Sequence, residues 1–351
     1  ECGDPGLVFL DAINRANPTP LLGPIEATNP CGEIPLLPHE ACNLGSLNLT
    51  HMLAASGGAR RIDWTKLERT VRLAVRFLDD VIEAGEFPFG EIDRVARGNR
   101  KIGLGVRGFA EMLILLGIPY DSDEAVGVAE RLMDFIAVVA GDASEELASR
   151  RGAFPNWRGS VHDASGRRVR HATRTSIAPT GTIGIIAGTS GGIEPLFALA
   201  FRRSHTMGGG PLREVNPLFR EHAAGLGPLG DRLLAHARKT GGLAGAEGVP
   251  AGTRSLFATA LEIPADRHLE LQAAFQRHVD NAVSKTINLP AGTPPEEIGR
   301  IYRRAWKLGL KGITVFRSGS KRAQVIEPGS DRDPGWGESP GCCGASGSYP
   351  G

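Results

Sequence analysis

The chain has 351 residues, of which 41% are hydrophobic and 23% charged, with 40 Lys and Arg against 39 Asp and Glu. This length allows one large α/β domain or two smaller ones. A formal charge of +1 excludes a global electrostatic pull toward nucleic acid or acidic membranes. No run approaches the roughly 20 apolar residues of a membrane-spanning helix, and no signal peptide is evident. We therefore predict a cytoplasmic protein, and since the chain begins with Glu1 instead of Met we expect a piece of a longer polypeptide.

Hydrophobic periodicity predicts helices separated by short apolar runs, which indicates an α/β architecture with buried strands. Prolines block any long helix in residues 1–60, which we expect to be loop and short strand. Helices are predicted over residues 64–84, 123–150, 266–285 and 294–308. The Gly-rich segment 98–108 is predicted to lead into a further helix that ends near residue 117. Residues 204–255 are predicted to be loose, and residues 313–316 to be a strand. Beyond about Lys321 the Gly, Ser, Pro and Asp content predicts a flexible tail.

Five cysteines in a chain of this kind do not form a disulfide framework. No Cys-x-x-Cys pair is present and no His falls at zinc-finger spacing, so we predict no metal site. Cys31 and Cys42 lie close together, whereas Cys342 and Cys343 are adjacent in the tail and Cys2 stands at the terminus. This placement raises the question of redox or radical use of the thiols.

The densest motif is Asn29-Pro-Cys31-Gly-Glu33. On an extended segment these alternating side chains would point the same way. A thiol between an amide and a carboxylate suits an atom-transfer group beside a hydrogen-bond donor and a general base. The alternative is a Pro-rich loop with a buried cysteine and an Asx-type turn at Asn29. For this motif in isolation, the alternative is the better supported of the two.

A second segment, residues 178–195, is rich in Gly, Thr and Ser. Its glycines would expose backbone N–H groups and its hydroxyls would add donors, which suits the binding of phosphate. It is not a P-loop, because no Gly-Lys-Ser/Thr follows. A tight turn between core strands explains the composition equally well.

Gly103, Gly105 and Gly108 satisfy Gly-x-Gly-x-x-Gly. They follow a charged segment, however, and no acidic residue ends a second strand about 20 residues later. We therefore reject a dinucleotide-binding fold and interpret these glycines as sites of close backbone packing or cofactor approach.

Together these motifs resemble the catalytic subunit of ribonucleotide reductase, specifically the adenosylcobalamin-dependent class II enzymes. The resemblance runs in order from about residue 5 to residue 322, over residues 17–20, 29–33, 42–46, 100–108, 179–183, 280–286 and 311–317. It implies that residues 1–322 form the C-terminal half of a ten-stranded α/β barrel. A central finger loop at about 26–50 would carry the radical cysteine, and residues 323–351 would be the flexible tail.

The resemblance also implies a role for each site residue. Cys31 would be the thiyl radical that removes hydrogen from C3′ of the ribose, and Glu33 would take the proton of the 3′-hydroxyl. Asn29 would hydrogen-bond the substrate. Cys42 would belong to the thiol pair that becomes a disulfide when the 2′-hydroxyl leaves as water. The substrate phosphates would be held by Pro179, Thr180, Gly181, Thr182 and Ile183.

The class assignment depends on the radical source, because a protein thiol cannot generate its own radical. Class I subunits import the radical through adjacent tyrosines, but here no two tyrosines are adjacent in the sequence, since they stand at Tyr120, Tyr302 and Tyr349. The glycyl-radical and zinc patterns of class III are absent as well. Adenosylcobalamin is therefore the predicted cofactor, with contacts that the sequence does not assign. The alternatives are a class I large subunit and a non-catalytic nucleotide-binding homologue that uses the Thr180 loop.

The resemblance further implies a ribonucleoside diphosphate substrate and deoxyribonucleotide products for DNA synthesis. Thioredoxin or a glutaredoxin-like protein would be the reductant, and the complete enzyme would bind allosteric nucleotide effectors and form a homodimer. Cys342 and Cys343 are candidates for a redox shuttle, with an altered or truncated tail as the alternative. Because the family's partner for Cys42 lies far upstream and Cys2 does not match it, we expect an incomplete fragment that is inactive alone.

Overall fold

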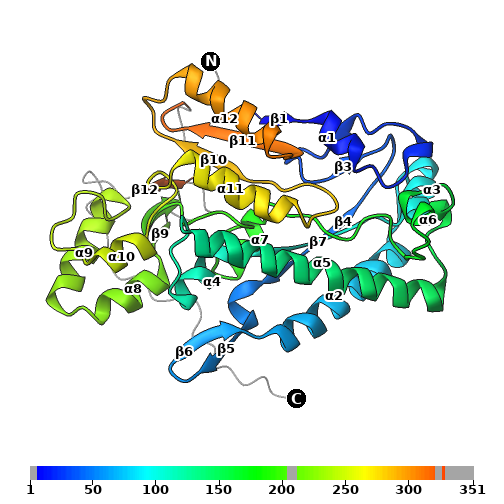
Figure 1. The fold of residues 1–351 in the computed structure, drawn as a ribbon. Helices are drawn as coiled ribbons and strands as arrows, with labels where there is room; N and C mark the ends of the chain where they lie inside the picture. The colour runs from blue at the N-terminus through cyan, green and yellow to red at the C-terminus, as the bar shows by residue number, and fades with distance from the viewer. Residues whose placement is uncertain (1–5, 204–211, 321–325, 329–351) are drawn as a thin grey trace. The chain divides into compact units, whose positions relative to one another are not determined.

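The structure is a computed structural model that describes residues 6–203, 212–320 and 326–328 (Figure 1). The chain divides into two compact units. The first comprises Glu1–Phe197 and Ala258–Arg322, and the second comprises Ala198–Phe257 and Ala323–Gly351. Among the described residues, no helix combines the length and the apolar character that crossing a membrane requires. Within the same ranges, no group of three or more His, Cys, Asp or Glu side chains is arranged to hold a metal ion.

The first unit contains most of the helices and strands. Its α-helices are α1 (Leu10–Arg15), α2 (Trp64–Ala84), α3 (Gly90–Asn99), α4 (Phe109–Leu116), α5 (Asp123–Arg151), α6 (Val161–Ala164), α7 (Gly181–Ile186), α11 (Ala265–Gln276) and α12 (Pro295–Lys307). Its strands are β1 (Gly6–Val8), β2 (Ala27–Thr28), β3 (Pro35–Leu36), β4 (Asn43–Asn48), β5 (Leu53–Ser56), β6 (Ala59–Ile62), β7 (Ile102–Arg107), β10 (Thr286–Leu289) and β11 (Gly312–Arg317). Short 3₁₀ turns are Pro20–Leu22, Leu49–Met52 and Pro155–Trp157.

A row of parallel segments forms the centre of this unit. β4 pairs with β7. β7 in turn lies beside the segment that contains Thr175 and Ile177, through a parallel bridge between Leu104 and Thr175. A second parallel bridge joins Ile177 to Val283, and β10, which follows Val283, pairs with β11. β1 runs antiparallel along the other side of β11. The described residues thus place five parallel segments side by side, as the predicted half-barrel requires.

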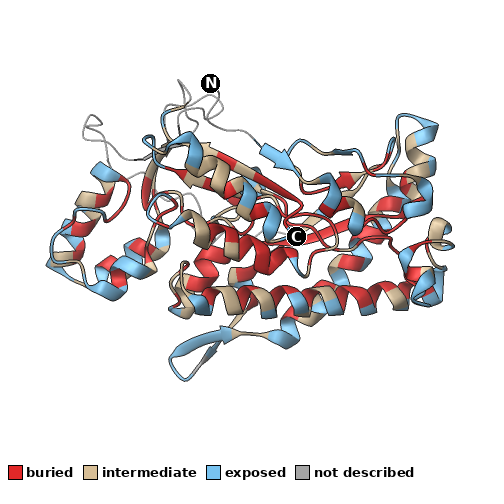
Figure 2. Ribbon diagram, turned by 45° about the horizontal axis from the view of Figure 1, so that its top comes forward, coloured by how far each residue is buried: buried red, intermediate tan, exposed pale blue. Residues whose placement is uncertain are grey.

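Amphipathic helices cover this row. α2 begins at Asp63, whose carboxylate caps the helix by accepting the Lys66 N–H at 2.9 Å. α2 packs on β4, β7 and α5, and α11 and α12 pack on β10 and β11 (Figure 1). Figure 2 shows buried residues concentrated along the inward faces of these helices. The buried residues of α2 keep the predicted spacing of three to four and are Leu67, Val71, Val75, Leu78, Asp79 and Ile82.

The glycines of β7 pack closely against the adjacent segments, which confirms the first of the two interpretations given to them. A Cβ atom added to Gly105 would lie 2.1 Å from the Ser176 carbonyl oxygen. One added to Gly103 would lie 2.4 Å from Leu44 Cδ2. β7 therefore needs glycine at these positions so that adjacent segments can approach.

The predicted helix over 266–285 is wrong beyond Gln276, where α11 ends. The chain then enters the parallel row, because the Asn281 N–H donates to the Thr175 carbonyl and the Ile177 N–H donates to the Ala282 carbonyl. Apolar residues at 279, 282 and 283 fit a helix or a buried strand equally, so periodicity alone cannot separate the two.

The prediction that residues 204–255 are loose is also wrong over residues 212–255, where the second unit is folded. It contains α8 (Pro217–Ala224), α9 (Pro228–Thr240), α10 (Ala251–Leu256) and a sheet in the order β12 (Ile326–Pro328), β8 (Ala200–Arg203), β9 (Leu212–Val215). Its glycines mark helix ends, as at Gly227 and Gly241, which both have positive φ. The predicted tail, including Cys342 and Cys343, lies outside the described residues apart from β12.

We predict that Gly105→Ala destabilises the protein by about 1–3 kcal/mol, because the new Cβ cannot fit against the Ser176 carbonyl. Chemical denaturation should show a lower midpoint. The control is Gly90→Ala at the start of α3, where an added Cβ meets no atom within 4 Å. Equal midpoints for the two variants would contradict the close packing.

Candidate active site

Cys31 lies at the tip of a hairpin formed by β2 and β3, in which Thr28 pairs with Pro35. Residues 29–32 make a tight turn closed by a 3.0 Å hydrogen bond from the Gly32 N–H to the Asn29 carbonyl. Asn, Pro and Gly at the first, second and fourth positions suit such a turn. The Cys31 side chain is exposed. The tip is a turn and not the extended segment assumed from the alternating pattern, so that argument for a shared direction does not hold.

Main-chain contacts fix this hairpin against the parallel row. The Glu33 carbonyl accepts the Ala282 N–H and the Ser176 hydroxyl, each at 2.9 Å. Further down the loop, the Lys101 ammonium donates to the Glu40 carboxylate at 2.6 Å, and the two side chains are 1% and 0% exposed. The Asn99 amide also donates to Glu40, at 2.6 Å. The loop therefore has a fixed path beside the strands, with the cysteine at its tip.

The Glu33 side chain is 2% exposed, and its Oε2 atom is buried without a hydrogen-bond partner among the described residues. An unpaired buried carboxylate oxygen is costly unless a ligand or water completes it. The Asn29 amide oxygen, by contrast, accepts the Ile34 N–H at 3.0 Å, which is the local turn role considered for this residue. Glu33 is thus the side chain of the motif whose hydrogen bonding is left incomplete.

Both described thiols favour the protonated form. Burial raises the pKa of Cys31, and the negative charge of Glu33 adds to this shift. Burial raises the pKa of Cys42 to about 12, with Lys101 opposing and Glu40 and Glu33 reinforcing the shift. A protonated thiol can donate a hydrogen atom but is a poor nucleophile. The negative charge of Glu33 thus disfavours the thiolate form of both cysteines.

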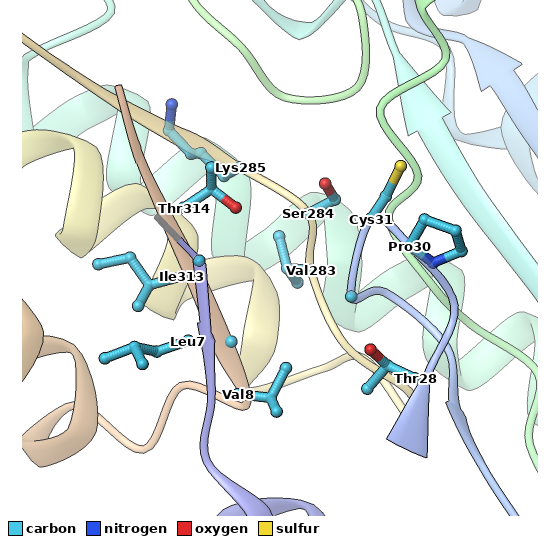
Figure 3. Close-up of a pocket in the computed structure, with 13 residues that line it drawn as sticks. Leu7, Val8, Thr28, Pro30, Cys31, Val283, Ser284, Lys285, Ile313 and Thr314 are labelled. Atoms are coloured by element: carbon cyan, nitrogen blue, oxygen red, sulfur yellow. The ribbon is translucent and has the colours of Figure 1, made fainter. Parts of the chain in front are cut away.

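A cavity of about 310 Å³ adjoins Cys31 (Figure 3). It is lined by Gly6, Leu7, Val8, Thr28, Pro30, Cys31, Gly32, Val283, Ser284, Lys285, Gly312, Ile313 and Thr314. In Figure 3 the Lys285 ammonium group points away from Cys31, and it donates to Glu194 at 2.7 Å. The structure thus brings Cys31 to a cavity that Asn29, Glu33, Cys42 and residues 179–183 do not line.

The predicted phosphate loop lies where the parallel segment that contains Ile177 ends. Thr180 adopts a left-handed conformation, with φ of 51°, immediately before α7. Its hydroxyl oxygen accepts the Gly192 N–H at 2.8 Å. Gly181, Thr182 and Ile183 are exposed, and N–H groups in the first turn of a helix have no intrahelical acceptor. The loop therefore presents backbone donors on its surface, as phosphate binding would require.

Several residues around these features were missed by the motif analysis. Ser284 and Thr314 line the cavity beside Cys31, and Glu40 and Lys101 anchor the loop. Thr314 lies on β11, and Ser284 directly follows Val283, which bridges Ile177. Both residues fall within segments already noted for their resemblance, which was the signal available. The pairing of Glu40 with Lys101 joins residues 61 positions apart, which no local pattern reveals.

This part-barrel, with a thiol-tipped hairpin beside a buried carboxylate, belongs to the ribonucleotide reductases. The family model described as "Ribonucleotide reductase, barrel domain" matches residues 1–167 and 163–316. The chain is 55% identical over 324 residues to a vitamin B12-dependent ribonucleoside-diphosphate reductase of Mycobacterium tuberculosis, covering 92% of this chain and 46% of that protein. It is 50% identical over 330 residues to the same-named enzyme of Thermoplasma acidophilum, covering 94% of this chain and 42% of that protein.

A solved structure shows the same fold. The class Id ribonucleotide reductase alpha subunit of Actinobacillus ureae superimposes with a TM-score of 0.73 at 24% sequence identity. The match covers 90% of this chain and 58% of that subunit. The α/β part-barrel prediction and the family prediction are thereby confirmed. The chain spans about half the length of the curated relatives it matches.

We predict that Lys101→Met destabilises the fold by about 3–5 kcal/mol, because it leaves the Glu40 carboxylate buried without its cation. Thermal or chemical unfolding would measure this loss. The double variant Lys101→Met/Glu40→Leu should recover much of it, since neither charge then remains. Lys66→Met, at an exposed position of α2, is the control and should leave the midpoint unchanged. A single variant as stable as the double variant would refute the anchoring role.

We predict that iodoacetamide modifies Cys31 well before Cys42 at pH 8, since Cys31 is exposed and the Cys42 thiol has a pKa of about 12. Below that pKa the thiolate fraction of Cys42 grows about tenfold per pH unit, so its modification rate should rise in the same proportion. Peptide mapping by mass spectrometry distinguishes the sites. In urea, where the protein is unfolded, the two cysteines should react at similar rates, which is the control. Similar rates for the two cysteines in the folded protein would contradict the structure.

Proposed function

We propose that this chain supplies the radical-bearing part of the catalytic barrel of an adenosylcobalamin-dependent ribonucleoside-diphosphate reductase. The observation that carries the proposal is the buried, unpaired Glu33 Oε2, on the same hairpin as an exposed cysteine whose thiol it affects electrostatically. A binding protein has no need of a general base kept next to a thiol. The named relatives are vitamin B12-dependent reductases, which supports this choice.

In the proposed reaction, Cys31 acts as a thiyl radical and takes the hydrogen atom from C3′ of the ribose, becoming a thiol. Glu33 accepts the proton of the 3′-hydroxyl as the 2′-hydroxyl leaves as water. Cys42 and a second thiol supply two electrons and two protons: one proton leaves with the 2′-hydroxyl as water, one hydrogen is delivered to C2′, and the two sulfur atoms form a disulfide. Glu33 then returns its proton to the 3′-oxygen. Cys31 then returns its hydrogen atom to C3′, which restores the radical. The raised pKa values keep both described thiols protonated, as hydrogen-atom transfer requires.

The remaining residues bind and orient the substrate in this proposal. The Asn29 amide oxygen is used by Ile34, so the Asn29 NH₂ group is the part offered to a substrate hydroxyl. Residues 179–183 would hold the two phosphates through the N–H groups of the exposed residues Gly181, Thr182 and Ile183 and through the threonine hydroxyls. We propose ribonucleoside diphosphates as the substrate class, since the relatives are named ribonucleoside-diphosphate reductases, and 2′-deoxyribonucleoside diphosphates for DNA synthesis as the products.

The cavity beside Cys31 fits the nucleoside part of the cofactor. At about 310 Å³ it is at the small end of ligand pockets, so it can receive an adenosyl group but not a corrin ring. Thr28, Ser284 and Thr314 give it polar contacts, and Leu7 and Val8 give it an apolar wall. Adenosylcobalamin, when bound, supplies the carbon radical that protein groups cannot make. Because Glu33 and Asn29 do not line this cavity, cofactor and substrate would reach Cys31 from different directions.

The reductant and the regulation belong to the same proposal. A thioredoxin or glutaredoxin-like protein would restore the thiols, with Cys342 and Cys343 as candidate carriers. Cys31 and Cys42 are both free, and the described residues contain no further cysteine to pair with Cys42. Allosteric nucleotides and a homodimer are proposed for the full-length enzyme, in the cytoplasm. The chain by itself is expected to show no turnover.

We expect Cys31→Ala to abolish deoxyribonucleotide formation, and Glu33→Gln to lower its rate by about 10²–10⁴ through loss of the general base. The assay uses a full-length reductase containing this chain, with adenosylcobalamin, a dithiol and a ribonucleoside diphosphate. Both variants should bind the nucleotide as the wild type does, as calorimetry would show.

Glu26→Gln is the control for this prediction, because it alters an exposed carboxylate just before the same hairpin. It should leave the rate unchanged. Normal turnover by Cys31→Ala would refute the proposed function. Normal turnover by Glu33→Gln would refute the proposed role of the carboxylate but would not affect the role proposed for Cys31.

A further inference from the structure

We infer that Glu111 is a positioning residue that fixes the shape of the phosphate loop through Ser190, so that it sets the enzyme's preference for phosphorylated ligands. Glu111 belongs to α4 and is 5% exposed. Its Oε1 atom accepts the Ser190 N–H at 2.8 Å, and its Oε2 atom accepts the Ser190 hydroxyl at 2.6 Å. This inference rests on the proposed function, since it concerns the loop assigned to the substrate phosphates.

Glu111 binds the start of the segment 190–194, and this segment is in contact with the phosphate loop. The Gly192 N–H donates to the Thr180 hydroxyl oxygen at 2.8 Å. A Cβ added to Gly191 would lie 2.2 Å from the Pro179 carbonyl oxygen, and one added to Gly192 would lie 2.8 Å from the Ala178 carbonyl oxygen. The backbone of residues 191–192 is therefore in close contact with that of residues 178–180. A displacement of Ser190 would consequently displace Thr180.

Thr180 depends on this support because its backbone is strained. Its φ of 51° and ψ of 35° are left-handed, a conformation that residues with a branched Cβ seldom adopt. The Thr180 side chain is held by Gly192, and its carbonyl accepts the Gly184 N–H at 2.8 Å. If the support moved, Thr180 would relax to an ordinary conformation. The N–H groups of Gly181 and the following residues would then turn to new directions.

Other side chains restrain the far end of the same segment. The Tyr120 hydroxyl donates to the Ile193 carbonyl at 2.5 Å, and Lys285 donates to the Glu194 carboxylate at 2.7 Å. Glu111 acts at the other end, on Ser190, which directly precedes Gly191 and Gly192. Burial raises the pKa of Glu111, while its two hydrogen bonds from Ser190 oppose the shift. A buried carboxylate is tolerated when donors satisfy it, and here both oxygens are used on one residue of the segment.

The test compares the affinity for a ribonucleoside diphosphate with that for the unphosphorylated ribonucleoside, by calorimetry on the full-length reductase. The ratio of the two Kd values isolates the contribution of the phosphates. In Glu111→Ala we expect this ratio to fall at least tenfold, with nucleoside affinity unchanged. Glu111→Gln should stay within twofold of wild type, because its oxygen can accept the Ser190 N–H and its NH₂ can donate to the Ser190 hydroxyl.

A matched control exists in the same unit. One Glu262 oxygen accepts both the N–H and the hydroxyl of Thr259, each at 2.8 Å. Glu262→Ala removes the same kind of contact elsewhere and should not change the ratio. Ser190→Ala is the milder companion variant, since it removes only the hydroxyl contact. We expect it to lower the ratio severalfold, and it serves if Glu111→Ala does not fold.

The outcomes are distinct. An unchanged ratio in Glu111→Ala, or in Ser190→Ala where the former does not fold, overturns the inference and leaves the proposed function intact. Parallel losses of nucleoside and diphosphate affinity also overturn it, because they indicate general damage to the fold. A wild-type enzyme with no preference for the diphosphate refutes the phosphate loop itself, and the inference with it. Loss of the preference in Glu111→Ala, with rescue in Glu111→Gln, supports the inference.

Discussion

The buried ion pair between Glu40 and Lys101 is the constraint on which the site depends. Neither side chain is more than 1% exposed, and their charged atoms are 2.6 Å apart. Asn99 and the Leu37 N–H also donate to the carboxylate, so its acceptors are used. Such a pair adds little net stability over apolar residues, but breaking it is costly. Its consequence is geometric: it fixes the base of the loop at the start of β7 and so determines where the tip lies.

With the base fixed, the middle of the loop is aligned by its own backbone. The Glu33 carbonyl completes the hydrogen bonding of Ala282 and Ser176, as an additional strand would. This contact buries the Glu33 side chain while the turn at Pro30 leaves Cys31 exposed at the tip. One short hairpin thus carries a buried carboxylate and an accessible thiol, and the negative charge of the carboxylate adds to burial in raising the pKa of that thiol. Main-chain contacts thus hold on one hairpin the two groups that we propose as the general base and the atom-transfer group.

Much of the fold followed from local patterns. α2 lies where hydrophobic periodicity predicted a helix and is capped by Asp63, and close packing was one of the two interpretations given to the glycines of β7. The failures were also physical. Val283 suits a helix or a buried strand, and only its bridge to Ile177 decides between them. Glycines such as Gly241 end helices in the second unit, where composition suggested a loose region.

For the site, the sequence by itself determined which residue types are present and their order: a thiol two residues from a carboxylate, and a Gly-rich segment before a short helix. Those follow from covalent connectivity, and they sufficed to indicate the family. Tertiary structure alone decided that Glu33 is buried and unpaired, that Cys31 borders a cavity with Ser284 and Thr314, and that Glu111 supports Thr180 through Ser190. The physical reason is that burial and hydrogen-bond completion depend on residues far apart in the chain, which no local pattern encodes.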